Sequence, residues 1–147
     1  MATVNVYLAF DGNCEQAFNF YKSVFGGDFT YMGRWSEMPS APGQPPINDA
    51  DKNKIMHVGL PISKETILMG ADFCEFEPSM KFIQGNNFSI CVTPKDENEA
   101  QKLFDALAAG GNITMPLQKQ FWGSLNGMLI DKFGITWMVD FELKQHD

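Results

Sequence analysis

An internal repeat is the feature of this 147-residue chain that most restricts its fold. The pattern Phe-x5-Gly-Gly-Asp/Asn-x-Thr occurs at residues 20–30 and again at residues 104–114, with each residue displaced by 84 positions. Both copies end a segment with helical spacing of apolar residues, and both lead into an extended segment. A displacement close to half the chain length predicts two copies of one supersecondary unit, neither of which closes a core alone. We expect a site on the concave surface between the two copies.

The spacing of apolar residues predicts the same succession of elements in each copy. The first copy reads as a strand over residues 4–10, a helix over 13–25 and strands over 28–37, 55–62 and 66–72. The second reads as a strand over 87–92, a helix over 95–109 and strands over 112–118, 124–131 and 136–142. Asn13 is predicted to cap the first helix, and paired glycines end both helices. We therefore predict an α+β fold of two tandem β-α-β-β-β units, residues 1–74 and 87–147, with a linker over 75–86, in one compact domain.

Charge and cysteine content narrow the class of protein. The net charge is −7 and the isoelectric point about 4.7. An acidic balance argues against a nucleic-acid partner, because phosphate binding needs a basic surface, and it suits a cationic ligand. No apolar run approaches the ~18 residues of a membrane span, and residues 1–4 lack the pattern of a signal peptide. The three cysteines form no C-x-x-C pair, so we expect a cytoplasmic protein with no membrane association.

Several short segments carry a resemblance to a known family. They are Tyr7-Leu8-Ala9-Phe10-Asp11-Gly12-Asn13-Cys14, residues 17–21, Met56-His57, and residues 68–72, 115–118, 121–123, 131–134 and 137–139. In this order they resemble the vicinal oxygen chelate superfamily, which includes glyoxalase I, bleomycin-resistance proteins and extradiol dioxygenases. Within it, the chain is similar to the PhnB-like branch, often labelled 3-demethylubiquinone-9 3-methyltransferase-like. The resemblance implies curled mixed sheets around a cleft between the units, as in the glyoxalase/bleomycin-resistance-like fold, and a homodimer.

The resemblance also implies where a metal would bind. Metal enzymes of the superfamily place His or Glu on the first and last strands of each unit, and two of these positions fall on Val6 and Met138. Aliphatic carbons and thioethers do not hold a divalent ion that needs oxygen or nitrogen donors. We therefore expect Val6 and Met138 to line an apolar cleft without the usual metal site and without a cofactor. A divalent metal held by other residues stays open as an alternative.

Three residues are candidates for chemistry or for stacking on a ligand, and a fourth is predicted to be structural. His57 is the best candidate for acid–base chemistry or for one metal ligand, or it is a strand histidine bonded to a neighbour. Asp72 would bind a cation or orient the His57 imidazole, or it is a strand-end carboxylate facing water. Trp122 would stack on an aromatic or cationic ligand, or it belongs to the core or a dimer interface. Asp131 is predicted to be structural, as the first residue of a type I turn.

Three functions remain open on this basis. The leading one is a PhnB-like protein that binds a small molecule in the cleft without the usual metal. The second is a metal-dependent or acid–base enzyme of the lyase, isomerase or dioxygenase class that uses His57. The third is a structural protein that serves only assembly. Methyl transfer from S-adenosylmethionine has little support, because the strand-to-helix turn at residues 11–13 carries one glycine.

Overall fold

The computed structural model describes residues 2–38, 43, 47–74 and 81–143. The chain divides into two compact units, Met1–Ile83 and Gln84–Asp147, which are described one at a time. Half of the predicted linker, residues 75–80, lies outside the described residues. Within the described part of the chain, no helix has the length and apolar character needed to cross a membrane.

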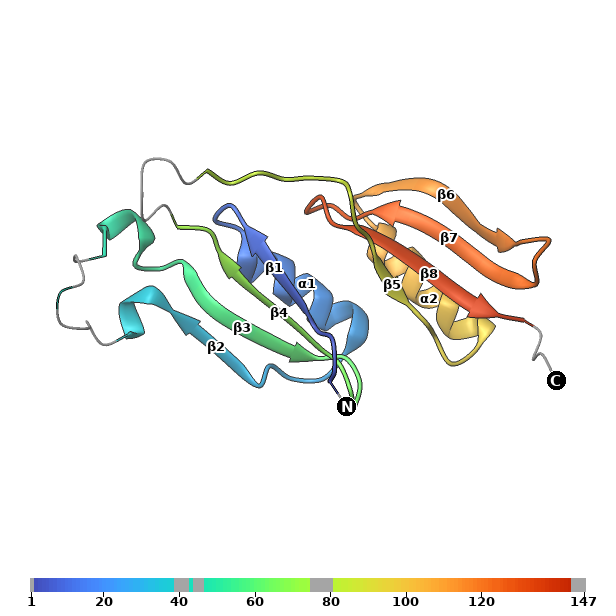
Figure 1. Cartoon of the computed structure of the whole chain (residues 1–147), viewed down its shortest axis with the longest axis horizontal. Coiled ribbons are helices and arrows are strands. Elements are labelled where there is room, and N and C mark those ends of the chain that lie inside the picture. The colour runs from blue at the N-terminus through green and yellow to red at the C-terminus, as the bar shows by residue number, and fades with distance from the viewer. Residues whose placement is uncertain (1, 39–42, 44–46, 75–80, 144–147) are drawn as a thin grey trace. The chain divides into compact units, whose positions relative to one another are not determined.

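Unit 1 is a four-stranded mixed sheet with one long helix (Figure 1). Its elements are β1 (Val6–Phe10), α1 (Cys14–Phe25), β2 (Tyr31–Arg34), the short 3-10 turns η1 (Trp35–Glu37) and η2 (Asp49–Asp51), β3 (Ile55–Pro61) and β4 (Ile67–Asp72). The strand order is β1-β4-β3-β2, with β1 parallel to β4 and the other pairs antiparallel. The first strand therefore pairs with the last.

Unit 2 repeats this arrangement. Its elements are β5 (Ile90–Val92), α2 (Glu97–Ala108), β6 (Asn112–Lys119), β7 (Ser124–Ile130) and β8 (Thr136–Glu142). The strand order is β5-β8-β7-β6, and again the first strand runs parallel to the last. The predicted α+β fold of two β-α-β-β-β units is confirmed in both sequence halves.

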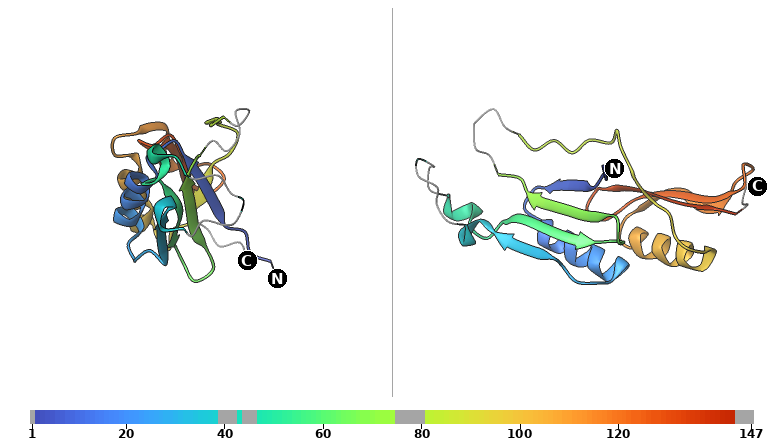
Figure 2. Two further views of the ribbon diagram at one scale, coloured as in Figure 1. Left: turned by 90° about the vertical axis from the view of Figure 1, so that its left-hand side faces the viewer. Right: turned by 60° about the horizontal axis from the view of Figure 1, so that its bottom comes forward.

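Each helix covers one face of the sheet of its own unit, as the views in Figure 2 show for α1 and α2. Side chains alternate between the two faces of a strand, so every second residue points toward the helix. In unit 1, Leu8 and Phe10 of β1 are buried on the face toward α1, whose Phe18 and Tyr21 are also buried. The rings of Phe18 and Tyr21 meet edge to face, with centroids 5.6 Å apart. The other face of the sheet is left without a helix from its own unit.

Two local predictions are corrected. The strand predicted over residues 28–37 is shorter, because the pairing register shifts between Gly33 and Arg34 and η1 follows. Asn13 precedes α1, but its side chain makes no capping hydrogen bond. Instead, the backbone N–H of Cys14 donates to Oδ1 of Asp72 at 2.9 Å. The cap of α1 thus comes from the end of β4, 58 residues along the chain, and no local sequence pattern could have identified it.

Asp131 holds the turn between β7 and β8, as predicted. The N–H of Gly134 donates to the Asp131 carbonyl at 2.9 Å, which closes the turn. The buried Asp131 carboxylate accepts from the N–H of Phe133 and Ile135 at 2.8 and 3.1 Å, and from Nε1 of Trp137 at 2.8 Å. Asp131 is therefore a structural residue of unit 2.

Candidate functional site

On the uncovered face of the unit 1 sheet, one row of paired residues crosses all four strands. The pairing register places Tyr7 of β1 beside Met69 of β4, Met69 beside Gly59 of β3, and Gly59 beside Tyr31 of β2. His57 lies two residues from Gly59 and therefore points to the same side. We call the surface formed by Tyr7, Tyr31, His57, Gly59 and Met69 the open face.

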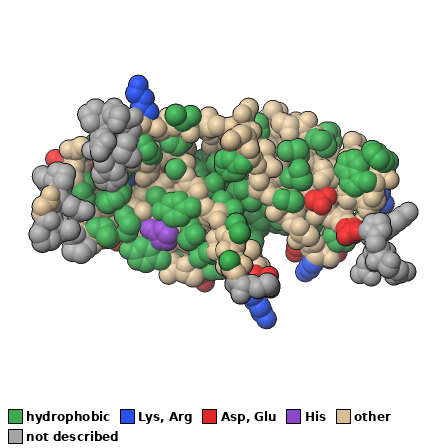
Figure 3. Space-filling model, in the orientation of Figure 1, with side chains coloured by type: hydrophobic (Ala, Val, Ile, Leu, Met, Phe, Trp, Pro, Cys, Tyr) green, Lys and Arg blue, Asp and Glu red, His purple; other side chains and the backbone are tan. Residues whose placement is uncertain are grey.

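His57 lies between two tyrosine rings on the open face. Its Nδ1 is 3.3 Å from the Tyr7 hydroxyl, and the ring centroids of Tyr7 and His57 are 5.6 Å apart. The centroid of the Tyr31 ring lies 6.0 Å from that of the imidazole, and the interplanar angles to His57 are similar, 34° for Tyr7 and 37° for Tyr31. Tyr7 and Tyr31 are each about half exposed (53% and 47%), so a ligand can reach their rings. Figure 3 shows a histidine side chain on this face bordered by hydrophobic ones.

Small residues leave room for these rings. Gly33 pairs with His57, and a Cβ atom on Gly33 would lie 2.6 Å from Cζ of Tyr31. Such a distance is a collision, so only glycine allows the Tyr31 ring to lie over the backbone here. The absence of a side chain at Gly33 therefore positions Tyr31 next to the imidazole.

The electrostatics of the site keep Tyr7 in its phenol form. Partial burial raises the pKa of Tyr7 above its usual value of 10.0, and the nearby Cys14 thiol group adds to the shift. A phenol with a raised pKa is protonated at neutral pH and has an O–H to donate. The site can thus offer a hydroxyl donor, an imidazole and two aromatic surfaces to a small molecule.

Asp72 does not join His57. It lies at the end of β4 on the face toward α1, only 5% exposed, whereas His57 is on the opposite side of the sheet. Both carboxylate oxygens are occupied: Oδ1 accepts from the N–H of Cys14 at 2.9 Å, and Oδ2 accepts from the N–H of Ile55 at 2.8 Å. The prediction that Asp72 orients the imidazole or binds a cation is therefore wrong, and so is the alternative of a carboxylate facing water. Its hydrogen bonds connect the end of β4 to the starts of α1 and β3.

The remaining predicted residues lie in different places. Val6 shares the helix side of β1 with Leu8 and Phe10, so its neighbour Tyr7 takes the open face. Met138 of β8 points away from α2, opposite the buried Trp137 and Val139.

Trp122 lies in the turn between β6 and β7. It is 54% exposed and packs edge to face on Phe121 with centroids 5.0 Å apart.

The structure brings His57 together with two tyrosines, Tyr7 and Tyr31, that were not among the residues predicted from the sequence. Their one signal in the sequence was alternation, since Tyr7 falls on the opposite side of β1 from Leu8 and Phe10.

The donor set does not fit the metal site that the fold family implies. Across the described ranges, no group of three or more His, Cys, Asp or Glu residues lies close enough together to hold an ion. The open face offers one imidazole and two phenols, and the other histidine, His146, is outside the described residues. Hard and borderline divalent ions favour carboxylate and several imidazole ligands. The residues of the open face therefore do not match that metal site.

Comparisons with known proteins agree on one family. The family model described as 3-demethylubiquinone-9 3-methyltransferase matches residues 2–140. Protein YjdN of Escherichia coli (strain K12) is 31% identical over 144 residues, which cover 95% of each chain. The crystal structure of protein PA1353 from Pseudomonas aeruginosa is 34% identical, with a TM-score of 0.82 and coverage of 97% of this chain and 98% of that one.

More distant structures extend the likeness. The PhnB protein from Bacillus cereus is 26% identical, with a TM-score of 0.70 and coverage of 95% and 99%. FosX from Listeria monocytogenes and a glyoxalase-related enzyme from Fulvimarina pelagi, at 8% and 16% identity, show the fold alone with TM-scores of 0.61 and 0.62. The two repeated units thus form a glyoxalase/bleomycin-resistance-like fold, and the chain belongs to the PhnB-like family described as 3-demethylubiquinone-9 3-methyltransferase.

Proposed function

We propose that the open face of unit 1 binds a small molecule with a flat ring, without the metal of the wider superfamily. The observation that carries this proposal is the His57 imidazole flanked by the rings of Tyr7 and Tyr31 at 5.6 and 6.0 Å. Offset or tilted aromatic rings at such distances attract a further ring, and each aromatic pair contributes roughly 0.5–1.5 kcal/mol beyond its buried area. Polar groups at the same place would fix the orientation of the ligand.

Charge indicates which ring compounds fit. The five residues that define the open face include no carboxylate, lysine or arginine, and the chain as a whole carries a net charge of −7. An anionic ligand would meet an unfavourable overall field without a local cation to compensate. A neutral or cationic ring compound with one hydrogen-bonding group is therefore the expected class, and the Tyr31 face suits a cation especially.

Methyl transfer is not the activity that the geometry favours. A nucleotide-like methyl donor usually lies at a glycine-rich turn before a helix, whereas the turn before α1 has one glycine, Gly12. The start of α1 is also already occupied by the Asp72 carboxylate, which binds the Cys14 N–H. The name of the family model therefore describes the family and not the chemistry we propose.

The Tyr7–His57 pair supports an acid–base enzyme as a second candidate. A phenol hydroxyl 3.3 Å from an imidazole nitrogen is close to hydrogen-bonding distance, and such a pair can deliver or remove a proton. A lyase or isomerase would need this pair within reach of a substrate carbon acid. Turnover that is lost in Tyr7→Phe, with ligand binding retained, would favour the enzyme over the passive receptor.

Screening of ring-bearing metabolites by equilibrium dialysis tests the proposed function, with protein purified without a histidine tag. A ligand found in this way should bind about tenfold more weakly to Tyr31→Ala, because one aromatic contact is lost. Phe20→Ala is the matched control, because Phe20 belongs to α1 on the other side of the sheet, and it should bind normally. A library that returns no binder, or equal losses in both variants, would contradict the proposal. Elemental analysis of the same sample should show no stoichiometric metal.

A homodimer and a cytoplasmic location stay predictions. Exposed apolar side chains in both units support an interface, among them Val4, Ile83, Phe88 and Phe121. A stable dimer buries about 800 Å² on each partner, spread over roughly 20–30 residues, and these exposed apolar side chains would be part of that surface. Sedimentation at several protein concentrations measures the assembly directly, and a monomer at every concentration would remove this part of the proposal.

A further inference from the structure

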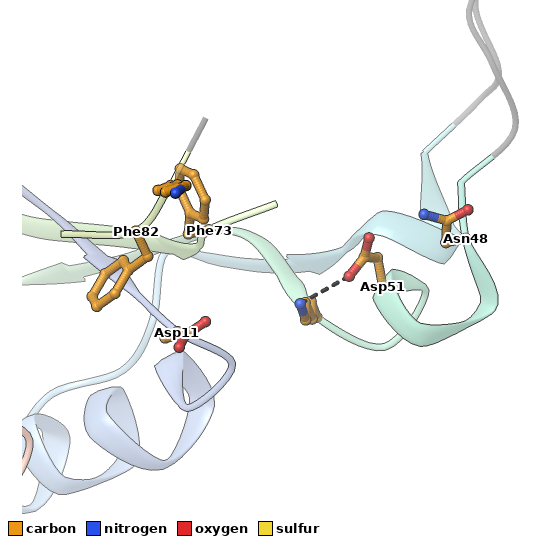
Figure 4. Close-up of a pocket in the computed structure, with 7 residues that line it drawn as sticks. Asp11, Asn48, Asp51, Phe73 and Phe82 are labelled. Atoms are coloured by element: carbon orange, nitrogen blue, oxygen red, sulfur yellow. Dashed lines mark ion pairs between the residues drawn. The ribbon is translucent and has the colours of Figure 1, made fainter. Parts of the chain in front are cut away.

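We propose that unit 1 has a second site, separate from the open face, that binds a small zwitterion with a flat apolar group, the chemistry of an aromatic amino acid. The site is a cavity of about 520 Å³ (Figure 4). It is lined by Asp11, Asn48, Asp51, Lys54, Phe73, Lys81 and Phe82. None of these residues belongs to the open face, so the proposal does not rest on the function proposed above. The volume is within the range of about 300–1,000 Å³ that is typical of ligand pockets.

The cavity forms where three strands meet. β1 and β4 run parallel and end side by side, because Phe10 pairs with Asp72 and the N–H of Phe73 donates to the Phe10 carbonyl at 2.7 Å. Asp11 and Phe73 therefore leave the sheet at the same edge. β3 begins at this edge, and Lys54 is the residue before it. The position of the cavity follows from the strand pairing of the fold.

One wall is aromatic. The rings of Phe73 and Phe82 have centroids 6.1 Å apart and an interplanar angle of 54°, and both side chains are partly exposed. Figure 4 shows these two rings near Asp11, with Asn48 and Asp51 on the other side of the cavity. A flat apolar group can pack on the exposed part of these rings.

The other lining groups carry charges of both signs. Asp51 and Lys54 form an ion pair at 2.8 Å with side chains only 19% and 29% exposed, so they largely neutralise each other. The hydrogen bond to Asp51 raises the pKa of Lys54, which keeps it cationic. Asp11 and Lys81 are exposed, and neither has a hydrogen bond or ion pair to another described residue. Among the described residues, Asp11 thus presents to the cavity a carboxylate without a bonded partner, and Lys81 presents an ammonium without one.

This charge pattern selects a zwitterion. An ammonium group on the ligand complements Asp11, and a carboxylate complements Lys81. A simple amine would leave Lys81 facing a like charge, and a simple carboxylate would face the like charge of Asp11. Specificity of this kind comes from the repulsion of the wrong ligand as much as from attraction of the right one.

Calorimetric titration of the full chain with L-phenylalanine tests this site. Phenethylamine and 3-phenylpropanoate are the comparators, because each lacks one of the two charged groups. We expect L-phenylalanine to bind at least about tenfold more tightly than either, which is what one charge-assisted hydrogen bond supplies. Asp11→Asn and Lys81→Gln should each weaken its binding about tenfold.

Two matched controls lie in the turn between β3 and β4. Lys64→Gln and Glu65→Gln remove an exposed charge of each sign without touching the cavity, and should bind L-phenylalanine normally. Tyr31→Ala should also bind it normally, because the open face is a different site. Equal affinity for the three compounds, no saturable binding up to about 10 mM, or equal losses in the controls would each overturn the proposal.

Discussion

The two units share one pattern of strand pairing and carry different chemistry on it. In unit 1 the row across the uncovered face reads Tyr31, Gly59, Met69 and Tyr7 from β2 to β1. The corresponding row of unit 2 reads Met115, Met128, Met138 and Cys91. The edge residues correspond through the repeat itself, because Tyr7 and Cys91, like Tyr31 and Met115, are 84 positions apart.

The position next to each row differs as well. His57 stands beside the row of unit 1, and Asn126 stands beside the row of unit 2, where its Nδ2 donates to Oδ1 of Asp140 at 3.0 Å. Asn126 is 7% exposed and already has a partner, whereas His57 lies between exposed rings. The helix side of each sheet is mostly apolar in both units, with the buried Asp72 at the end of β4 as a charged exception. The other side differs between the units, with a polar aromatic surface in unit 1 and methionines in unit 2.

Removal of the buried carboxylate of each unit should have the largest effect. Asp131→Ala leaves three N–H donors without their acceptor and should cost about 4 kcal/mol of unfolding free energy, and Asp72→Ala leaves two and should cost about 3 kcal/mol. Urea denaturation measures both. The control is Asp105→Ala, an exposed position in α2, with a change below about 0.5 kcal/mol. Losses below about 1 kcal/mol in both buried variants would show that these carboxylates are dispensable.

The second glycine of the repeat should behave differently in the two units. Gly111 has no room for a side chain, because a Cβ atom would collide with the Ile130 carbonyl and lie 2.9 Å from Cα of Asp131. Gly27 has open space around it but a φ of 81°. Gly111→Ala should therefore cost about 3 kcal/mol and Gly27→Ala about 1 kcal/mol in thermal or urea unfolding. The reverse order would mean that conformation, not space, limits both positions.

Exchange of the edge residues between the rows tests whether the open face is responsible for binding. The double variant Tyr7→Cys with Tyr31→Met gives unit 1 the edge residues of unit 2, and should weaken binding of a ring ligand by about thirtyfold, or about 2 kcal/mol. The reciprocal variant, Cys91→Tyr with Met115→Tyr, should leave binding unchanged. Fluorescence titration with the ligand from the dialysis screen measures both. If the reciprocal variant alone alters affinity, the ligand binds to unit 2.

The smallest expected difference between the two units is in the reactivity of their cysteine thiols. Cys14 and Cys74 of unit 1 are buried and Cys91 of unit 2 is exposed, so the native protein should react with one equivalent of maleimide and Cys91→Ser with none. Partial burial, and secondarily the charge of Asp140, raises the pKa of Cys91 above 9.0. Because the thiolate is the reactive form, the rate should keep rising with pH beyond 9. Asp140→Asn should shift this rise toward lower pH, and an unchanged profile would rule out the influence of Asp140.

The elements of the fold could be predicted from the sequence because two separate spacing patterns mark the residues on the helix side of each unit. Alternation in the strands and the 3.6-residue spacing in the helices both place apolar residues on one side, as where Phe10 of β1 meets Phe18 of α1. The internal repeat then supported the elements predicted in each half, because the other half gave the same succession. The succession of strands and helices in each unit and the Asp131 turn could therefore be predicted, whereas the order of the strands within each sheet was not.

The residues of the candidate site could not be predicted from the alternation of apolar and polar residues along the strands alone. Which residue of β4 lies beside Tyr7 depends on pairing register, and a slip of one residue moves every side chain to the other face. Counting along a family pattern led to Val6, whereas its neighbour Tyr7 takes the open face. Asp72 shows the same limit, because its partners Cys14 and Ile55 are fixed only by the folded chain.

Trp137, which donates a hydrogen bond to Asp131, can serve as an intrinsic fluorescence probe of unit 2. The indole of Trp137 is buried and bonded to a carboxylate, and Trp35 is the single tryptophan of unit 1. Replacement of the exposed Trp122 by phenylalanine would leave one emitting indole per half. Stopped-flow fluorescence could then record whether the two halves fold together or in succession.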